Sequence, residues 1–145
     1  MDIMSNRIGT RPAEPPDGPA LFLLARAFAT SFVVEQPAFE RAFAELLTHP
    51  DAFLAVAEAD GKIAGYVLGF EHPTFFANGR VAWVEEVMVG ESFRRQGIGR
   101  RLMEVFEAWT TAREAKMIAL ATRRVSDFYK ALGYGESAAY FRKRL

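Results

Sequence analysis

The most informative stretch of the sequence is Arg94-Arg95-Gln96-Gly97-Ile98-Gly99-Arg100. It follows an apolar run, Val81 to Val89, that has the pattern of a β-strand, and it leads into an amphipathic helix that we expect to begin near Ile98. Glycine has no Cβ to block positive φ, and the dipole of a helix favours negative charge at its start. The glycine pair therefore predicts backbone N–H groups that point at an anion.

Other interpretations of this loop are weaker or less specific. A nucleotide-triphosphate loop needs Lys-Ser or Lys-Thr after its last glycine, but Arg100-Arg101 stands there. A dinucleotide fingerprint needs a third glycine at the position of Leu102. A plain turn with solvated arginines also fits two glycines, and only the surrounding sequence favours a binding site over it.

Apolar spacing elsewhere predicts a mixed α/β layer fold. Asp60-Gly61 separates two apolar runs and is typical of a two-residue hairpin turn. Helices are expected after Pro19, from Pro37 to Thr48, from Ile98 and from Val125 to Leu132. Strands are expected over Arg7–Arg11, Ala52–Ala59, Lys62–Phe70, Val81–Val89, Met117–Ala121 and Ala138–Arg142.

Size and composition predict one domain over residues 1–145. The longest apolar run, Pro19 to Ala29, is broken by Arg26 and falls short of the roughly 20 residues that span a bilayer, so no membrane segment is expected. Met1 to Asn6 lacks the features of a signal peptide, so we expect a cytoplasmic protein. With no cysteine and two isolated histidines, we expect no disulfide, no acyl-cysteine intermediate and no metal site.

Charge is distributed unevenly along the chain. The residues before Arg94 include 6 basic and 13 acidic side chains, and those from Arg94 onward include 12 basic and 5 acidic ones. This asymmetry fits a surface charge distribution without functional meaning, a basic region that binds nucleic acid, or a division between a cation-binding and an anion-binding half.

Two motifs resemble those of the GNAT superfamily of acetyltransferases. Val84-Glu85-Glu86-Val87-Met88-Val89 followed by Arg94 to Gly99 is similar to the family's strand, loop and glycine pair, and Asp127 to Tyr134 resembles its late helix with an aromatic-tyrosine pair. The resemblance covers Ala52 to Tyr134 well. It implies a central, mostly antiparallel twisted sheet of six to seven strands flanked by about four helices.

The resemblance also implies acetyl-CoA as co-substrate. Backbone amides from Gln96 to Arg100 would bind its pyrophosphate, and the strand end near Met88 and Val89 would pair with the pantetheine arm and donate an N–H to the thioester carbonyl. The implied cofactor-binding residues are Val87, Met88, Val89, Arg94, Arg95, Gln96, Gly97, Ile98, Gly99, Arg100, Arg101 and Tyr129.

Two adjacent carboxylates, Glu85 and Glu86, are the candidates for a catalytic base or amine anchor. Strand side chains alternate, so only one of them can face the cleft unless the strand is bulged. In a regular strand, Glu85 would lie on the same face as Trp83, Val87 and Val89. Its resemblance to the acidic pair of polyamine acetyltransferases makes it the first candidate. Glu86 is the second, and at least one of the pair is expected to be solvated.

Tyr129 resembles the family tyrosine beside the coenzyme sulfur, where it would protonate the departing thiolate. The competing interpretation places Tyr129 in the core stripe with Phe128 and Leu132.

The predicted function is transfer of an acetyl group from acetyl-CoA to a primary amine, on a small molecule, peptide or protein, by direct transfer in a ternary complex. A non-catalytic acyl-CoA-binding module is the alternative. A nucleic-acid binder is more distant, so no nucleic-acid partner is expected, and the sequence leaves a homodimer open.

Overall fold

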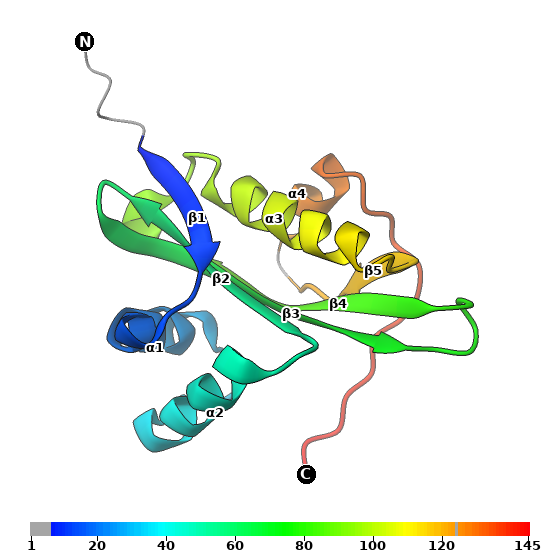
Figure 1. Ribbon diagram of the computed structural model, residues 1–145, viewed down its shortest axis with the longest axis horizontal. Helices are drawn as coiled ribbons and strands as arrows, with labels where there is room; N and C mark the ends of the chain where they lie inside the picture. The colour runs from blue at the N-terminus through cyan, green and yellow to red at the C-terminus, as the bar shows by residue number, and fades with distance from the viewer. Residues whose placement is uncertain (1–6, 124) are drawn as a thin grey trace.

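The computed structural model describes residues 7–123 and 125–145, and the expectation about a signal peptide therefore lies outside the described residues. Five described strands form one sheet in chain order, with every neighbouring pair antiparallel except the parallel last pair (Figure 1). The strands are β1 (Ile8–Pro12), β2 (Ala52–Ala59), β3 (Lys62–Pro73), β4 (Arg80–Val89) and β5 (Met117–Leu120).

Helices cover both faces of this sheet. Helices α1 (Gly18–Phe28) and α2 (Gln36–Thr48) lie on one face, and α3 (Ile98–Ala112) and α4 (Ser126–Ala131) lie on the other (Figure 1). The short 3-10 helices η2 (Pro15–Asp17) and η3 (Glu91–Phe93) precede α1 and the glycine loop. No helix in the described part of the chain has the length and apolar character needed to cross a membrane.

The turn between β2 and β3 has the predicted conformation. Asp60 and Gly61 have φ values of 53° and 81°, as a tight hairpin turn requires. The hairpin is therefore confirmed, together with the mixed α/β class, the mostly antiparallel sheet and the four α-helices.

The predicted count of six to seven strands is wrong for the described residues, because Ala138–Arg142 is not a strand. The tail instead reaches the loop after α1, where Arg142 donates a hydrogen bond of 2.9 Å to Ser31 Oγ and the Arg144 guanidinium lies 4.3 Å from the centre of the Phe32 ring. These side-chain contacts hold the tail without any backbone pairing to β5.

Two cores stabilise the sheet, one on each face. The α3-side core contains Val67, Val84, Ile98, Leu102 and Phe106, and the α1-side core consists of Leu21, Val56, Tyr66 and Leu68. Both cores continue to the end of β4, because Val87 and Val89 pack against the α3-side core and Met88 against the α1-side core. This end of the strand is therefore held from both faces.

We expect Phe106→Ala to lower the free energy of unfolding by about 3–5 kcal/mol, because Phe106 is 0% exposed and its removal leaves a cavity beside Phe53 and Trp109. The matched control is Phe75→Ala, at a side chain that is 102% exposed, which should change it by less than about 0.5 kcal/mol. Urea denaturation measures both. Equal losses in the two variants would contradict this account of the core.

Candidate active site

The start of α3 presents a row of backbone donors. Gly97 caps the helix with φ of 80°, and Arg95 also has a positive φ, of 66°. Within the described residues, the N–H groups from Gln96 to Arg100 donate to no protein acceptor, whereas Arg101 N already bonds to Gly97 O at 3.1 Å. These free donors and the helix dipole together suit an anion.

The last part of β4 has an open edge. Its pairing with β5 ends at Val84 and Leu120, so Glu86 to Val89 pair with β3 alone. Gly90 N donates to Ala64 O on the β3 side at 2.7 Å, and main-chain groups alternate between the two edges of a strand. The N–H and C=O groups of Val87 and Val89 therefore face the open edge, while those of Met88 face β3.

The open edge and the helix start lie side by side. Arg94 Nε donates a hydrogen bond of 3.2 Å to Val89 O, which ties the loop to the strand. A Cβ at Gly99 would lie 3.8 Å from Val89 Cγ2 and 3.2 Å from the Phe128 ring of α4, so a glycine there lets the three elements converge. The predicted strand end, glycine loop and late helix are thus brought together.

A β-bulge changes the predicted assignment of the two carboxylates to the faces of β4. The register between β3 and β4 shifts so that Leu68 pairs with Glu86 and Gly69 with Val84, which leaves Glu85 as the extra residue. Val87 packs against the α3-side core, while Glu85 is exposed and does not follow the same alternation. The grouping of Glu85 with Val87 and Val89 is therefore wrong.

Glu86 instead lies on the α1 side of the sheet, where Tyr66 holds it. The Tyr66 hydroxyl donates a hydrogen bond of 2.6 Å to Glu86 Oε1. Burial raises the pKa of Glu86, the hydrogen bond from Tyr66 lowers it, and the nearby charge of Glu85 raises it. The net pKa lies above the usual range of a glutamate, so this carboxylate can exchange a proton closer to neutral pH.

Sequence reasoning missed Tyr66. The residue lies inside the apolar run that predicted β3, and its only signal was a single hydroxyl in that run. Its position opposite Met88 becomes visible only once β3 and β4 are paired.

Tyr129 packs against the α3-side core, with its ring 4.9 Å from that of Phe128 and 6.0 Å from that of Tyr134. Burial raises the pKa of its hydroxyl, which therefore stays protonated at neutral pH. The residue is thus part of the core stripe, and its role toward a ligand stays a prediction.

The predicted arginines differ in their surroundings. Arg101 Nη2 donates to Ile8 O on β1 at 3.1 Å, so its side chain braces the fold. Arg95 and Arg100 are exposed beside the free N–H groups and are the better placed charges for an anion.

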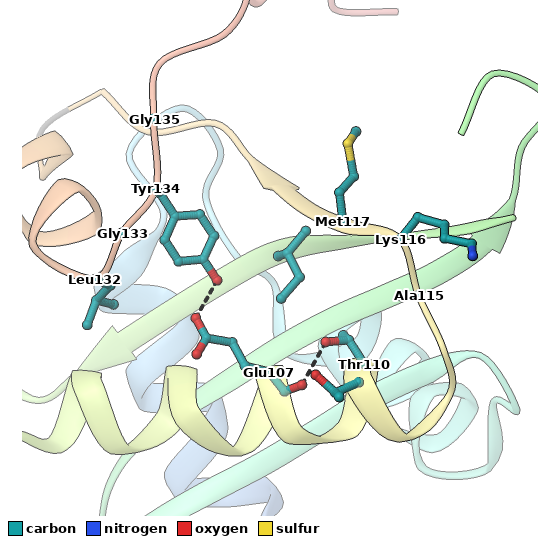
Figure 2. Close-up of a pocket in the computed structure, with 11 residues that line it drawn as sticks. Glu107, Thr110, Ala115, Lys116, Met117, Leu132, Gly133, Tyr134 and Gly135 are labelled. Atoms are coloured by element: carbon teal, nitrogen blue, oxygen red, sulfur yellow. Dashed lines mark hydrogen bonds between the residues drawn. The ribbon is translucent and has the colours of Figure 1, made fainter. Parts of the chain in front are cut away.

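A separate pocket of about 450 Å³ lies between the second half of α3, β5 and the segment after α4 (Figure 2). In this pocket the Tyr134 hydroxyl donates a hydrogen bond of 2.6 Å to Glu107 Oε2. Its lining includes none of the predicted site residues. Among residues 7–123 and 125–145, no group of three or more His, Asp or Glu side chains is placed to hold a metal ion.

A protein-family model matches most of this chain, including the strand end and the glycine loop. The model described as the acetyltransferase (GNAT) family covers residues 20–134. The chain belongs to this family. The match includes β4, the glycine loop and α4, which carried the resemblance in the sequence.

Solved structures share the fold of this GNAT family member along nearly its whole length. A transcriptional regulator from Bacillus halodurans C-125 has 23% identity and a TM-score of 0.85, over 96% of this chain and 100% of that one. Glucosamine-6-phosphate N-acetyltransferase from Arabidopsis thaliana has 23% identity and a TM-score of 0.80, over 94% and 97%. An aminoglycoside N-acetyltransferase in complex with CoA has 19% identity and a TM-score of 0.84, over 100% of both chains.

Proposed function

We propose that the protein is an N-acetyltransferase that moves an acetyl group from acetyl-CoA to a primary amine in a ternary complex. The observation that carries this proposal is the row of free N–H groups from Gln96 to Arg100 beside the open edge of β4. Membership of an acetyltransferase family supports it, as does the CoA complex of an aminoglycoside N-acetyltransferase with the same fold.

The helix start fits the pyrophosphate of acetyl-CoA. A diphosphate offers oxygen acceptors to successive N–H groups, and Gly97 supplies the positive φ that turns these groups outward. The exposed Arg95 and Arg100 add positive charge, while Arg101 keeps its contact with β1. The cofactor residues are therefore mainly backbone groups.

The open edge of β4 fits the pantetheine arm and the thioester. The arm would pair with the outward groups of Val87 and Val89, as a partner strand does. An N–H aimed at the developing charge on the acetyl oxygen lowers the barrier by about 3 kcal/mol. The side chain of Met88 would line the acceptor side, because it packs on the opposite face from Val87 and Val89.

Glu86 is the better candidate for the general base. An alkylamine with a pKa near 10.4 is mostly protonated at neutral pH and must lose a proton before its nitrogen can attack. Glu86 has a raised pKa and a fixed hydrogen-bond partner, whereas Glu85 is exposed and better suited to attract the cationic amine. The nitrogen then bonds to the acetyl carbon as the C–S bond breaks, and the thiolate leaves.

Tyr129 would supply a proton to that thiolate. The thiol that forms has a pKa of about 8.5, so a phenol with a raised pKa is a weaker acid than the thiol and a poor proton donor to the thiolate. A thiolate also leaves readily without help. The contribution of Tyr129 is therefore modest.

The acceptor is an amine on a small molecule, a peptide or a protein. Direct transfer needs no acyl-enzyme, consistent with a chain that has no cysteine. The competing function is an acyl-CoA-binding module, which would keep the loop and the open edge but would not need Glu86.

Calorimetry with acetyl-CoA, followed by a thiol-release assay over a panel of amines, tests the proposal. We expect binding, and release of CoA with at least one amine. Binding without release on any amine would favour the module, and absence of binding would contradict both functions.

Gly97→Ala should weaken acetyl-CoA binding about tenfold, because forcing a Cβ into the left-handed region shifts the N–H groups. The matched control is Gly61→Ala, at a φ of 81° in the β2–β3 turn, which carries similar strain away from the site. Calorimetry should give unchanged affinity for the control. Equal affinities for both variants would place the anion elsewhere.

Glu86→Gln should lower kcat by about 100-fold at neutral pH, because an amide cannot accept the proton, and Glu85→Gln should mainly raise the KM for the amine. Initial rates over a range of amine concentrations distinguish the two effects. The reverse pattern would make Glu85 the base.

Tyr129→Phe should lower kcat measurably but by no more than about tenfold, because a thiolate is a good leaving group that needs little help from an acid. The control is Tyr140→Phe, at a side chain that is 59% exposed. The pH profile of kcat measures the effect, and turnover unchanged across pH would reject the acid role.

A further inference from the structure

Tyr66 and Glu86 form a pair across β3 and β4. Tyr66 is 3% exposed and belongs to the α1-side core with Leu21 and Leu68. Its hydroxyl lies 2.6 Å from Glu86 Oε1, and Glu86 Oε2 has no hydrogen-bond partner within the described residues. The two oxygens of one carboxylate are therefore in different surroundings.

We propose that Tyr66 is a positioning residue, which holds one oxygen of Glu86 and leaves the other oriented toward the acceptor amine. This inference rests on the proposed function, in which Glu86 is the base. Tyr66 itself touches neither the amine nor the thioester, and acts only through Glu86.

The buried ring makes Tyr66 a constant donor. Burial and the neighbouring carboxylate raise the pKa of its hydroxyl far above neutral, so the proton stays on the phenol. A phenol has a single O–H to donate, and packing against Leu21 and Leu68 restricts the ring. The orientation of Glu86 is therefore fixed before the amine binds.

The charged surroundings of Glu86 predict the effect of losing this hydroxyl. Burial and Glu85 raise the pKa of Glu86, and Tyr66 is the group that lowers it. The one charged side chain of α1, Arg26, is exposed and lies 5.3 Å from the centre of the Phe22 ring, and on α2 Glu40, Arg41 and Glu45 are exposed. Without the phenol only the raising influences remain, so the pKa of Glu86 must rise.

The chain provides an internal control of the same chemistry. In the pocket of Figure 2, the Tyr134 hydroxyl donates to Glu107 Oε2 over the same distance of 2.6 Å. That pair lies on α3 and after α4, away from the open edge of β4. Tyr134→Phe therefore removes an equivalent hydrogen bond without touching the proposed base.

The test is a ¹³C NMR titration of the glutamate side-chain carboxyl groups in the full chain, with Glu86→Gln and Glu107→Gln assigning the two signals. We expect Tyr66→Phe to raise the titration midpoint of Glu86 by about one pH unit, and Tyr134→Phe to leave it unchanged. An unchanged Glu86 midpoint in folded Tyr66→Phe would overturn the proposal.

The signal of Tyr66 itself supplies a second readout if Tyr66→Phe does not fold. The ring carbon that bears the Tyr66 hydroxyl should shift on Glu86→Gln and not on Glu107→Gln. The absence of such a shift would equally overturn the pairing.

Enzyme kinetics then separate positioning from a structural role. Tyr66→Phe should shift the acid limb of the pH profile of kcat/KM to higher pH by about one unit. At pH values below the limb, kcat/KM should therefore fall about tenfold, and at higher pH it should return to the wild-type value. A loss of activity equal at every pH would refute positioning. Wild-type protein that acetylates no amine would instead contradict the proposed function, while the NMR result would still stand.

Discussion

The site depends on the point at which β4 loses β5 as a partner. The parallel ladder ends at Val84 and Leu120, and the next residue, Glu85, is the extra residue of a bulge. Beyond it the main-chain groups of Val87 and Val89 face no strand. Backbone N–H and C=O groups need partners, so an edge left open in this way retains hydrogen-bonding capacity that a ligand can use.

Packing holds the two halves of the site in register. The residue immediately after Gly97 is Ile98, which is 1% exposed in the α3-side core, so the helix start cannot shift without opening that core. At the other end of the loop, Arg94 is bonded to Val89 O. The N–H groups of the loop are thus positioned by one buried apolar contact, at Ile98, and one hydrogen bond, from Arg94.

Local signals predicted most of the fold and part of the site. Periodicity located the helices, Asp60-Gly61 located the hairpin, and Gly97 located the cap of α3, because each depends on neighbours in sequence. The bulge at Glu85 depends on which residue of β3 stands opposite, and the placement of the tail depends on a hydrogen bond between Arg142 and Ser31. Such long-range pairings leave no pattern in one sequence, which is why Tyr66 was missed.

Ion pairs between residues distant in sequence also limit what the net charge of each half of the chain says about the surface. The excess of acidic residues before Arg94 suggested a surface for cations, yet several of these carboxylates are neutralised within the fold. Asp17 and Glu58 pair with Arg11, and Asp51 and Glu71 pair with Arg80 and Arg113. Arg113 comes from the basic half, so the two halves partly cancel inside the molecule. In the proposed function, the charge that attracts a cationic amine is local, at the adjacent Glu85 and Glu86, where the charge of Glu85 raises the pKa of Glu86.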